Sequence, residues 1–471
     1  MAYRGLWKSL AIVVVAALRI AGSPLLAEET EGSKKSVGGG KDVSFSSESG
    51  NFTLQLGFWG QTRFQAYDRD QWRRTSRGIL TAPIPVENVG LTQLNFDLPL
   101  LRVYARGTMF KPWLTYKLEI SLVENDEGLR EVFIPALDPT GSQAVLVRAG
   151  AESQDGRTVK LIDDYIDGVP LKTVGFRLGQ FKEPFGRQEL VRDTDLQMTQ
   201  RSIASRFFAP GRDRGVELKG ATTTGKIGYF VGVFNGTGLT ARANTDSSLA
   251  YALRLTGTSE GPYLDIESNL DAPERFHAQG GVAWYNNSQR TTASSDPLDL
   301  LGNVEESRID ADLEFFWKRR VNLLLEYYQS RIRVDDSIAL RMKLICFGAY
   351  NQGLTTCNQQ GYNAQTGLLL GDHQELSARY SMVDSDRDLD RDRQIETTLN
   401  YTYFFNRHVL RWSTSLSFLK LEVNAPGSSG LDVQKGDASI PTIAPFPNPG
   451  AFPGLTDDDN KLLITQLQWV F

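Results

Sequence analysis

The sequence predicts an all-β chain that closes into a transmembrane antiparallel up-and-down β-barrel of about sixteen strands. Three observations predict this fold: apolar and polar residues alternate over many segments, tight and long connections alternate along the chain, and the last strand carries a terminal aromatic residue. After the first 27 residues, no apolar run reaches the length of a membrane-spanning helix. Such a chain can span a bilayer only with strands in which every second residue is apolar and faces the lipid.

The alternation is clearest in residues 114–122, where five apolar positions enclose Thr115, Lys117, Glu119 and Ser121. Because successive side chains of a strand point to opposite faces, this segment has one apolar and one polar face. A soluble β-sandwich has the same alternation, with its apolar face inside. Aromatic residues near segment ends favour the membrane, because they suit an interfacial girdle. The candidates are Trp59, Trp113, Trp317, Trp412 and Trp469.

Sixteen strands follow from this pattern, an even number as single-chain bacterial barrels need. They are expected near residues 52–66, 91–109, 111–124, 159–170, 173–184, 213–222, 225–235, 249–258, 275–287, 305–318, 321–334, 359–371, 373–384, 392–406, 408–423 and 461–471. Connections after odd strands are mostly long, as extracellular loops are, and those after even strands are mostly tight. Residues 259–274 are a long exception. A barrel of this size is wide enough for a water-filled channel, whose lumen we expect to be polar.

The first 27 residues have the order of a secretory signal peptide: Arg4 and Lys8, an apolar run, then small residues up to Ala27. The alternative, a short membrane anchor, needs a longer run. Residues 28–50 are predicted to be a flexible periplasmic segment, and residues 51–471 the barrel. Removing the three basic residues of the signal from the 51 leaves 48 basic against 56 acidic residues, a net charge of −8. This balance argues against nucleic acid as a partner.

Only two cysteines occur, Cys346 and Cys357. In an exported chain the oxidising periplasm favours a disulfide between them, worth about 3 kcal/mol for a loop of about a dozen residues. The alternative is two unpaired thiols.

Three short motifs resemble one porin family. They are FRLGQFKEPF at residues 176–185, RDRG at residues 212–215 after a loop, and HQELSARY at residues 373–380. From about residue 50 to 471 the chain resembles the phosphate-selective porin O and P family. The resemblance implies a homotrimeric outer-membrane porin that favours small anions such as phosphate. Separately, the terminal aromatic residues Trp469 and Phe471 are the candidate C-terminal signal for the barrel assembly machinery. Family members cluster lysines at their constriction, whereas Lys182 is the one lysine within this motif.

The loop after Pro184 is the candidate constriction. Its basic residues, with Lys182, are the candidate anion-binding residues: Arg187, Arg192, Arg201, Arg206, Arg212 and Arg214. The loop also has four acidic residues, but none lies between residues 199 and 212. Arginines at the narrowest point would attract anions, and a guanidinium suits planar contacts to phosphate or carboxylate. Alternatively, these arginines neutralise carboxylates of the barrel wall, such as Asp310, Asp312 and Glu314.

The expected polar faces divide by charge. Four arginines form a candidate basic wall: Arg63, Arg102, Arg106 and Arg411. Acidic residues of other strands would face them: Asp310, Asp312, Glu314, Glu326 and Glu396. Two such walls would orient polar solutes by a transverse field. The alternative is the ordinary composition of a water-facing surface.

No cofactor, metal site or catalytic site is expected. The acidic turn at residues 384–393 lacks the glycine and the closing glutamate of a calcium loop. The three histidines, His277, His373 and His408, lie in no recognisable catalytic motif. The sequence therefore predicts an outer-membrane porin for passive diffusion of small solutes, with a preference for anions. A cation-leaning porin, a non-conducting structural or adhesive barrel, and a soluble carbohydrate-binding protein are the alternatives.

Overall fold

The computed structural model describes residues 43–74, 86–123, 133–137, 144–148, 159–171, 173–239, 244, 247–290, 303–334, 354–387, 393–421 and 458–471. The predicted signal peptide, most of the predicted periplasmic segment and Cys346 lie outside these residues. Among the described residues, no helix is both long and apolar enough to cross a membrane.

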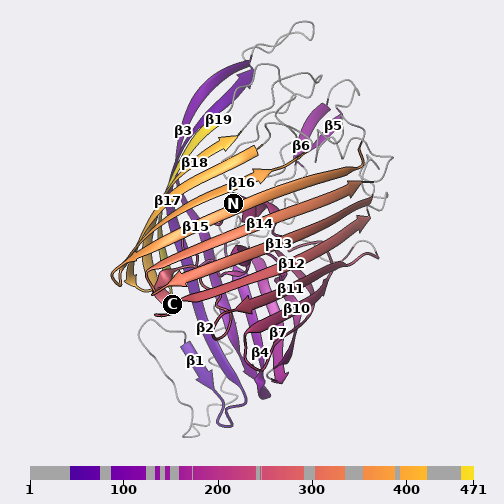
Figure 1. Cartoon of the computed structure of the whole chain (residues 1–471), viewed down its shortest axis with the longest axis vertical. Helices are drawn as coiled ribbons and strands as arrows, with labels where there is room; N and C mark the ends of the chain where they lie inside the picture. The colour runs from indigo at the N-terminus through magenta and orange to yellow at the C-terminus, as the bar shows by residue number, and fades with distance from the viewer. Residues whose placement is uncertain are drawn as a thin grey trace, which may run out of the picture.

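Sixteen antiparallel strands form one closed ring (Figure 1), as the sequence predicts. In chain order they are β2 (Thr53–Arg74), β3 (Val86–Met109), β4 (Lys111–Ser121), β7 (Lys160–Leu171), β8 (Val174–Lys182), β9 (Arg212–Ala221), β10 (Ile227–Phe234), β11 (Ala250–Thr258), β12 (His277–Arg290), β13 (Asn303–Trp317), β14 (Val321–Val334), β15 (Thr356–Leu370), β16 (Gln374–Asp384), β17 (Arg393–Asn406), β18 (Leu410–Leu421) and β19 (Asp458–Val470). Each strand pairs with the next, and β19 pairs with β2 to close the barrel.

A short strand completes the seam of the barrel. β1 (Val43–Ser46) pairs with the first residues of β2, where Ser46 faces Thr53. The last strand pairs with the same edge of β2 further along, and Phe471 exchanges two backbone hydrogen bonds with Phe58. β1 therefore satisfies the edge of β2 that β19 is too short to reach. A separate hairpin is made by β5 (Phe133–Leu137) and β6 (Ala144–Arg148).

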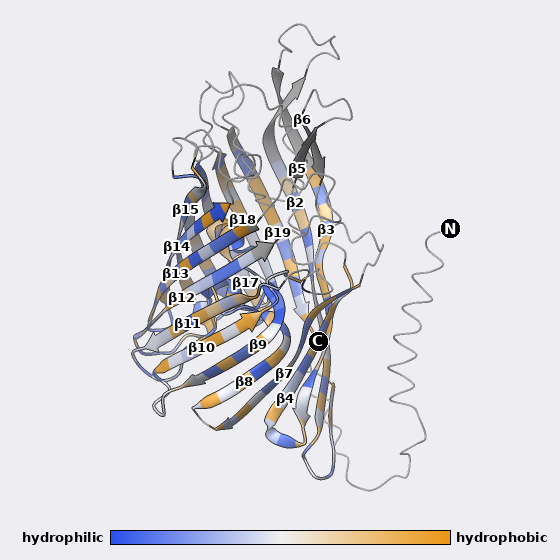
Figure 2. Cartoon of the chain, turned by 90° about the vertical axis from the view of Figure 1, so that its right-hand side faces the viewer, coloured by the Kyte–Doolittle hydropathy of each residue, from blue (hydrophilic) through white to orange (hydrophobic). Residues whose placement is uncertain are grey.

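The strands present an apolar outer face and a second face toward the lumen, and hydrophobic and hydrophilic residues alternate along them (Figure 2). In β13, Ile309, Leu313 and Trp317 are exposed, whereas Asp310 and Glu314 are buried. β14 alternates exposed and buried positions along its length. Exposed leucine and valine on one face of a closed barrel is the arrangement that a lipid-facing surface requires.

Two expectations about side chains are wrong. Trp59, expected in the outer girdle, is buried on the lumen side, where its Nε1 donates to Glu119 Oε1 at 3.3 Å. Its neighbour Phe58 takes the outer position, because adjacent residues of a strand cannot share a face. The lumen is also not uniformly polar, since an apolar cluster lies inside it.

The tight turns lie where the sequence predicts them. Lys318 and Arg319 connect β13 to β14 with φ values of 50° and 51°. Two consecutive positive φ values are those of a type I′ turn, which matches the twist of paired strands. Residues 259–274, the long exception at this end, contain no strand. They hold the short helix η2 (Asn269–Asp271), whose Asn269 and Leu270 are buried.

The outer face gives a testable depth dependence. We expect Leu313→Arg to lower the free energy of unfolding from lipid vesicles by about 2–4 kcal/mol, because this residue lies well within β13 on the lipid side. Trp317→Arg, at the end of the same strand, should cost about 0–1 kcal/mol. Urea titrations in vesicles measure both values. Equal costs at the two positions would contradict the assignment of this face to lipid.

Candidate functional site

The predicted constriction loop folds into the barrel between β8 and β9. Gly186, with a φ of 75°, turns the chain away from β8, and Gly211, with a φ of 90°, returns it to β9. Glycine adopts this backbone region without steric cost. Between them lie two short helices, α2 (Arg187–Leu190) and α3 (Ile203–Phe208). Most of their side chains are buried, which is the environment of a segment that the barrel encloses.

An apolar cluster holds the loop against the barrel wall. Phe208 of α3 stacks on Tyr328 of β14 with ring centroids 5.5 Å apart. Phe185 contacts the rings of Tyr285 and Tyr328 at 6.3 Å each. The cluster also contains Phe181, Ile203, Ala204, Phe234, Ala250, Ala252, Ala283 and Val383. This part of the lumen is apolar because it packs against loop residues rather than against water.

Carboxylates of the acidic wall accept hydrogen bonds from the same loop. Glu326 Oε1 accepts the backbone N–H of Gln188 at 2.8 Å, and Glu396 Oε2 accepts that of Ile203 at 2.9 Å. Glu314 pairs with Arg187 at 2.9 Å, and both side chains are fully buried. These carboxylates therefore position the loop.

The predicted basic wall contacts the opposite edge of the loop. Arg411 donates to the carbonyl of Leu196 at 2.6 Å, and Arg63 donates to that of Thr199 at 3.2 Å. Arg102 pairs with Asp193 at 3.1 Å. Arg106 instead donates to Gln55 on the neighbouring strand at 3.1 Å. Three of the four arginines thus contact the loop. The loop therefore lies between the basic wall, which donates hydrogen bonds to it, and the acidic wall, which accepts hydrogen bonds from it.

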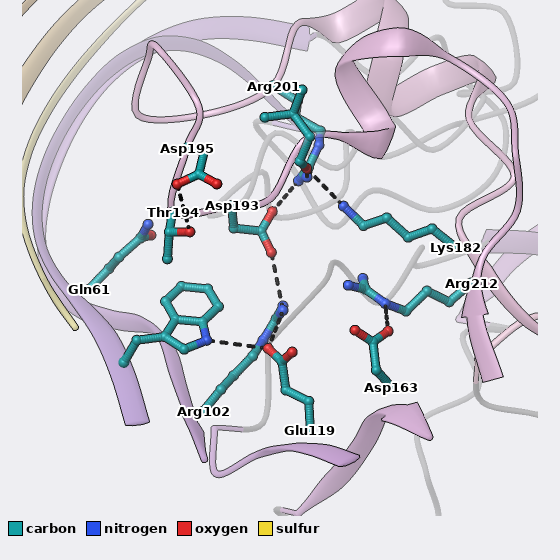
Figure 3. Close-up of polar contacts among 12 residues, drawn as sticks. Gln61, Arg102, Glu119, Asp163, Lys182, Asp193, Thr194, Asp195, Arg201 and Arg212 are labelled. Atoms are coloured by element: carbon teal, nitrogen blue, oxygen red, sulfur yellow. Dashed lines mark hydrogen bonds and ion pairs between the residues drawn. The ribbon is translucent and has the colours of Figure 1, made fainter. Parts of the chain in front are cut away.

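The loop arginines meet carboxylates. Arg201 pairs with Asp193 and with Glu189, the latter at 3.2 Å, and Arg212 pairs with Asp163 of β7 at 2.7 Å (Figure 3). Burial alone would raise the pKa of Asp193, but Arg201 and Arg102 hold it well below its ordinary value. Its carboxylate is therefore charged and joins the loop to the basic wall. Arg212 neutralises a carboxylate of the barrel wall, as the alternative expects, although Asp163 was not among those named. Arg201 instead pairs with acidic residues of its own loop.

The remaining candidates differ in their surroundings. Lys182 donates to the carbonyls of Glu189 and Val191 at 2.6 and 3.0 Å, at the edge of the same network. Burial lowers the pKa of Arg206 to about 10, so its guanidinium stays charged at neutral pH. Arg192 is exposed, and Arg214 is half-buried at the start of β9.

The lumen cations that the sequence analysis did not single out include Lys117 of β4, Arg177 of β8 and Lys219 of β9. Lys117 contacts Asp163 at 2.5 Å, while Arg177, at 2.6 Å, and Lys219 both contact Asp167. Each cation is more exposed than its partner. The side chains of the three cations are 26, 25 and 17% exposed, against 7% for Asp163 and 11% for Asp167. We call these three residues the wall cations.

The sequence marks each wall cation as a polar residue of a strand, but it does not show that the three lie close together. Each occupies a polar position of a predicted strand, yet Lys117 and Lys219 are far apart in sequence. The pairing of β4 with β7, β7 with β8 and β8 with β9 brings them together. The lysines that look scattered in the sequence therefore lie on one arc of the barrel wall, from β4 to β9.

Two further predictions concern the ends of strands. Cys357 is buried in β15 and forms a disulfide. Its expected partner lies outside the described residues, so the pairing stays a prediction. Trp469 and Phe471 pack around Phe58, with ring centroids 5.9 and 5.0 Å from it. Among the described residues, no group of three or more histidine, cysteine or acidic side chains is arranged to hold a metal ion.

Comparison with known proteins gives structural matches only. No protein-family model and no curated protein matches the sequence. Among solved structures, the anion-selective porin from Comamonas acidovorans superposes with a TM-score of 0.51 at 12% identity, covering 89% of this chain and 100% of that chain. The outer membrane channel DcaP of Acinetobacter baumannii gives a TM-score of 0.47 at 11% identity, with 90% and 99% covered.

The fold is that of an outer-membrane porin. A closed ring of sixteen strands with an apolar outer face, matched over the whole length of the Comamonas acidovorans porin, indicates the bacterial outer membrane as the location. The likeness concerns the fold, because the two sequences are only 12% identical.

Proposed function

We propose that this porin forms a water-filled channel for passive diffusion of small solutes and that it prefers anions. A closed barrel of sixteen strands is wide enough for a channel, and the inward-folded loop narrows it. The observation that carries the anion preference is the exposure of the wall cations. The three wall cations contact two carboxylates, Asp163 and Asp167. Water in the lumen meets the cations more than these carboxylates, and exposed cations along a pore attract anions.

The proposals for the family, the solute and the assembled form rest on the sequence motifs. We propose membership of the phosphate-selective porin O and P family, with phosphate among the solutes, a homotrimer as the assembled form and Trp469 with Phe471 as the signal for the assembly machinery. Lys117, Lys182 and Lys219 lie on strands β4, β8 and β9, which supports a lysine-lined passage of the kind that the resemblance implies. Chemical cross-linking in native membranes tests the trimer, and phosphate competition against chloride current tests the solute.

A cation-leaning diffusion porin is the second candidate. It is favoured by the ion pairs of Arg187, Arg201 and Arg212, which leave these loop residues less charge for solutes. A liposome-swelling assay separates either porin from a non-conducting barrel. We expect uncharged sugars to enter at rates that fall with their size, and we expect small anions to enter faster than cations of similar size. An absence of swelling with every solute would contradict a diffusion channel.

A further inference from the structure

Residues 262–274 enter the lumen from the short-turn end of the barrel, which porins direct toward the periplasm. Tyr263 donates to Asp312 of β13 at 3.1 Å and accepts from Arg254 of β11 at 3.2 Å. At the other end, Asp271 contacts Arg407 and lies 2.8 Å from Nε2 of His408, in the turn between β17 and β18. We call residues 263–271 the periplasmic strap. It runs along the barrel from β11 to the β17–β18 turn.

The middle of the strap is buried in a dense polar network. Asn269 donates through Nδ2 to Asn322 Oδ1 at 3.0 Å and to Glu375 Oε1 at 3.1 Å, and its backbone N–H donates to Glu375 at 2.9 Å. Ser268 donates to the other oxygen of Glu375 at 2.8 Å. Leu270 packs with Leu369 and Phe404 in a small apolar cluster. The middle of the strap, with Ser268, Asn269 and Leu270 buried, therefore packs directly against the wall.

The strap also joins the constriction loop. Glu267 accepts the backbone N–H of Gln197 at 2.9 Å. Arg187 donates to the carbonyls of Leu264 and Ile266 at 2.8 and 2.5 Å. The two inward segments therefore form one structure. The strap lies against strands β11 to β18, whereas the loop also contacts β2 and β3 through Thr199 and Asp193. The wall cations lie on β4, β8 and β9, on the other side of the ring.

We propose that the periplasmic strap is a second constriction element, which closes the β11–β18 side of the lumen and directs solutes past the wall cations, with Asp271 as its latch. This inference rests on the proposed function. It adds the path that solutes take through the lumen and the element that determines ion selectivity. The strap and its contacts bury the wall carboxylates Glu314 and Glu375. Release of the strap would therefore open a second route that is lined by carboxylates, and such a route favours cations.

The test uses single-channel recording of the purified full chain. Asp271→Asn removes the charge that contacts Arg407, and Arg407→Gln removes the partner, whose side chain is 60% exposed. An exposed ion pair contributes little, so we expect openings of higher conductance to become up to roughly fivefold more frequent in each variant. The zero-current potential in these openings should move toward potassium. Asn269→Ala, which removes the central donor, should have the same effect more strongly.

Glu260→Gln is the matched control. It removes the same charge from the same turn, at an exposed residue whose ion pair with the exposed Arg275 is long, at 3.8 Å. Its conductance and potential should equal those of the unmodified protein. If the latch variants fold, as resistance to protease shows, and also match the unmodified protein, the strap proposal is overturned while the porin function stands. If the unmodified protein is silent and the latch variants conduct, the strap is upheld as the barrier and passive diffusion is overturned. Silence of every variant overturns both.

Discussion

Neutralising the wall cations should reverse the ion preference of the channel. In the triple variant Lys117→Gln, Arg177→Gln and Lys219→Gln, the carboxylates of Asp163 and Asp167 remain in the lumen without these partners. A unit charge about 8 Å from a permeating ion in water contributes about 0.5 kcal/mol, with opposite signs for chloride and potassium. Each substitution should therefore change the chloride-to-potassium permeability ratio about fivefold, and all three should change it about a hundredfold. Zero-current potentials at low ionic strength, where screening is weak, measure this ratio.

A control triple separates a local field from net charge. Lys111→Gln, Lys226→Gln and Arg275→Gln remove the same three charges from exposed positions at the short-turn end of the barrel. We expect this variant to keep the selectivity of the unmodified protein. Equal shifts in the two triples would show that overall charge, and not the exposure of the wall cations, sets the preference.

Removal of the Arg187 guanidinium should release the constriction loop. This one group connects α2 to Glu314 of β13 and to two carbonyls of the periplasmic strap. In Arg187→Gln, Glu314 is left buried and uncompensated, which costs about 3–5 kcal/mol when one partner of a buried pair is removed. We expect a lower urea midpoint of unfolding in vesicles and a noisier, larger conductance, because both inward segments lose a shared anchor.

Two control variants test whether the unpaired Glu314 causes the loss of stability in Arg187→Gln. The double variant Arg187→Gln with Glu314→Gln removes both charges and should recover part of the stability, since no unpaired carboxylate remains. Arg192→Gln changes an exposed arginine of the same loop and should leave the midpoint unchanged within about 0.5 kcal/mol. A stability of Arg187→Gln equal to that of Arg192→Gln would contradict the anchoring role.

The strands were predictable because their information is local. Alternation in residues 309–317 is enough to assign Leu313 to the lipid and Asp310 to the lumen, and the exposures of these residues confirm it. The inward loop was predictable from a motif and from its length. The failure at Trp59 has a simple cause: two adjacent aromatics both suit a girdle, and only the phase of the whole strand decides between them.

The interior of the lumen could not be predicted in the same way. Arg212 meets Asp163, and Arg187 meets Glu314, across separations that no local pattern encodes. Residues 259–274 lack any periodicity, so nothing in their sequence indicated that Asn269 would be buried among strands β14 to β16. A closed barrel places every polar face in one lumen, and the pairing register then decides which charges become neighbours.

The zero-current potential of the purified protein in a planar bilayer, under a gradient of KCl, tests the central claim most directly. Exposed wall cations beside more deeply buried carboxylates predict a potential whose sign favours chloride. A potential that favours potassium would contradict the anion preference, and it would show that the paired loop arginines and the acidic wall determine selectivity instead.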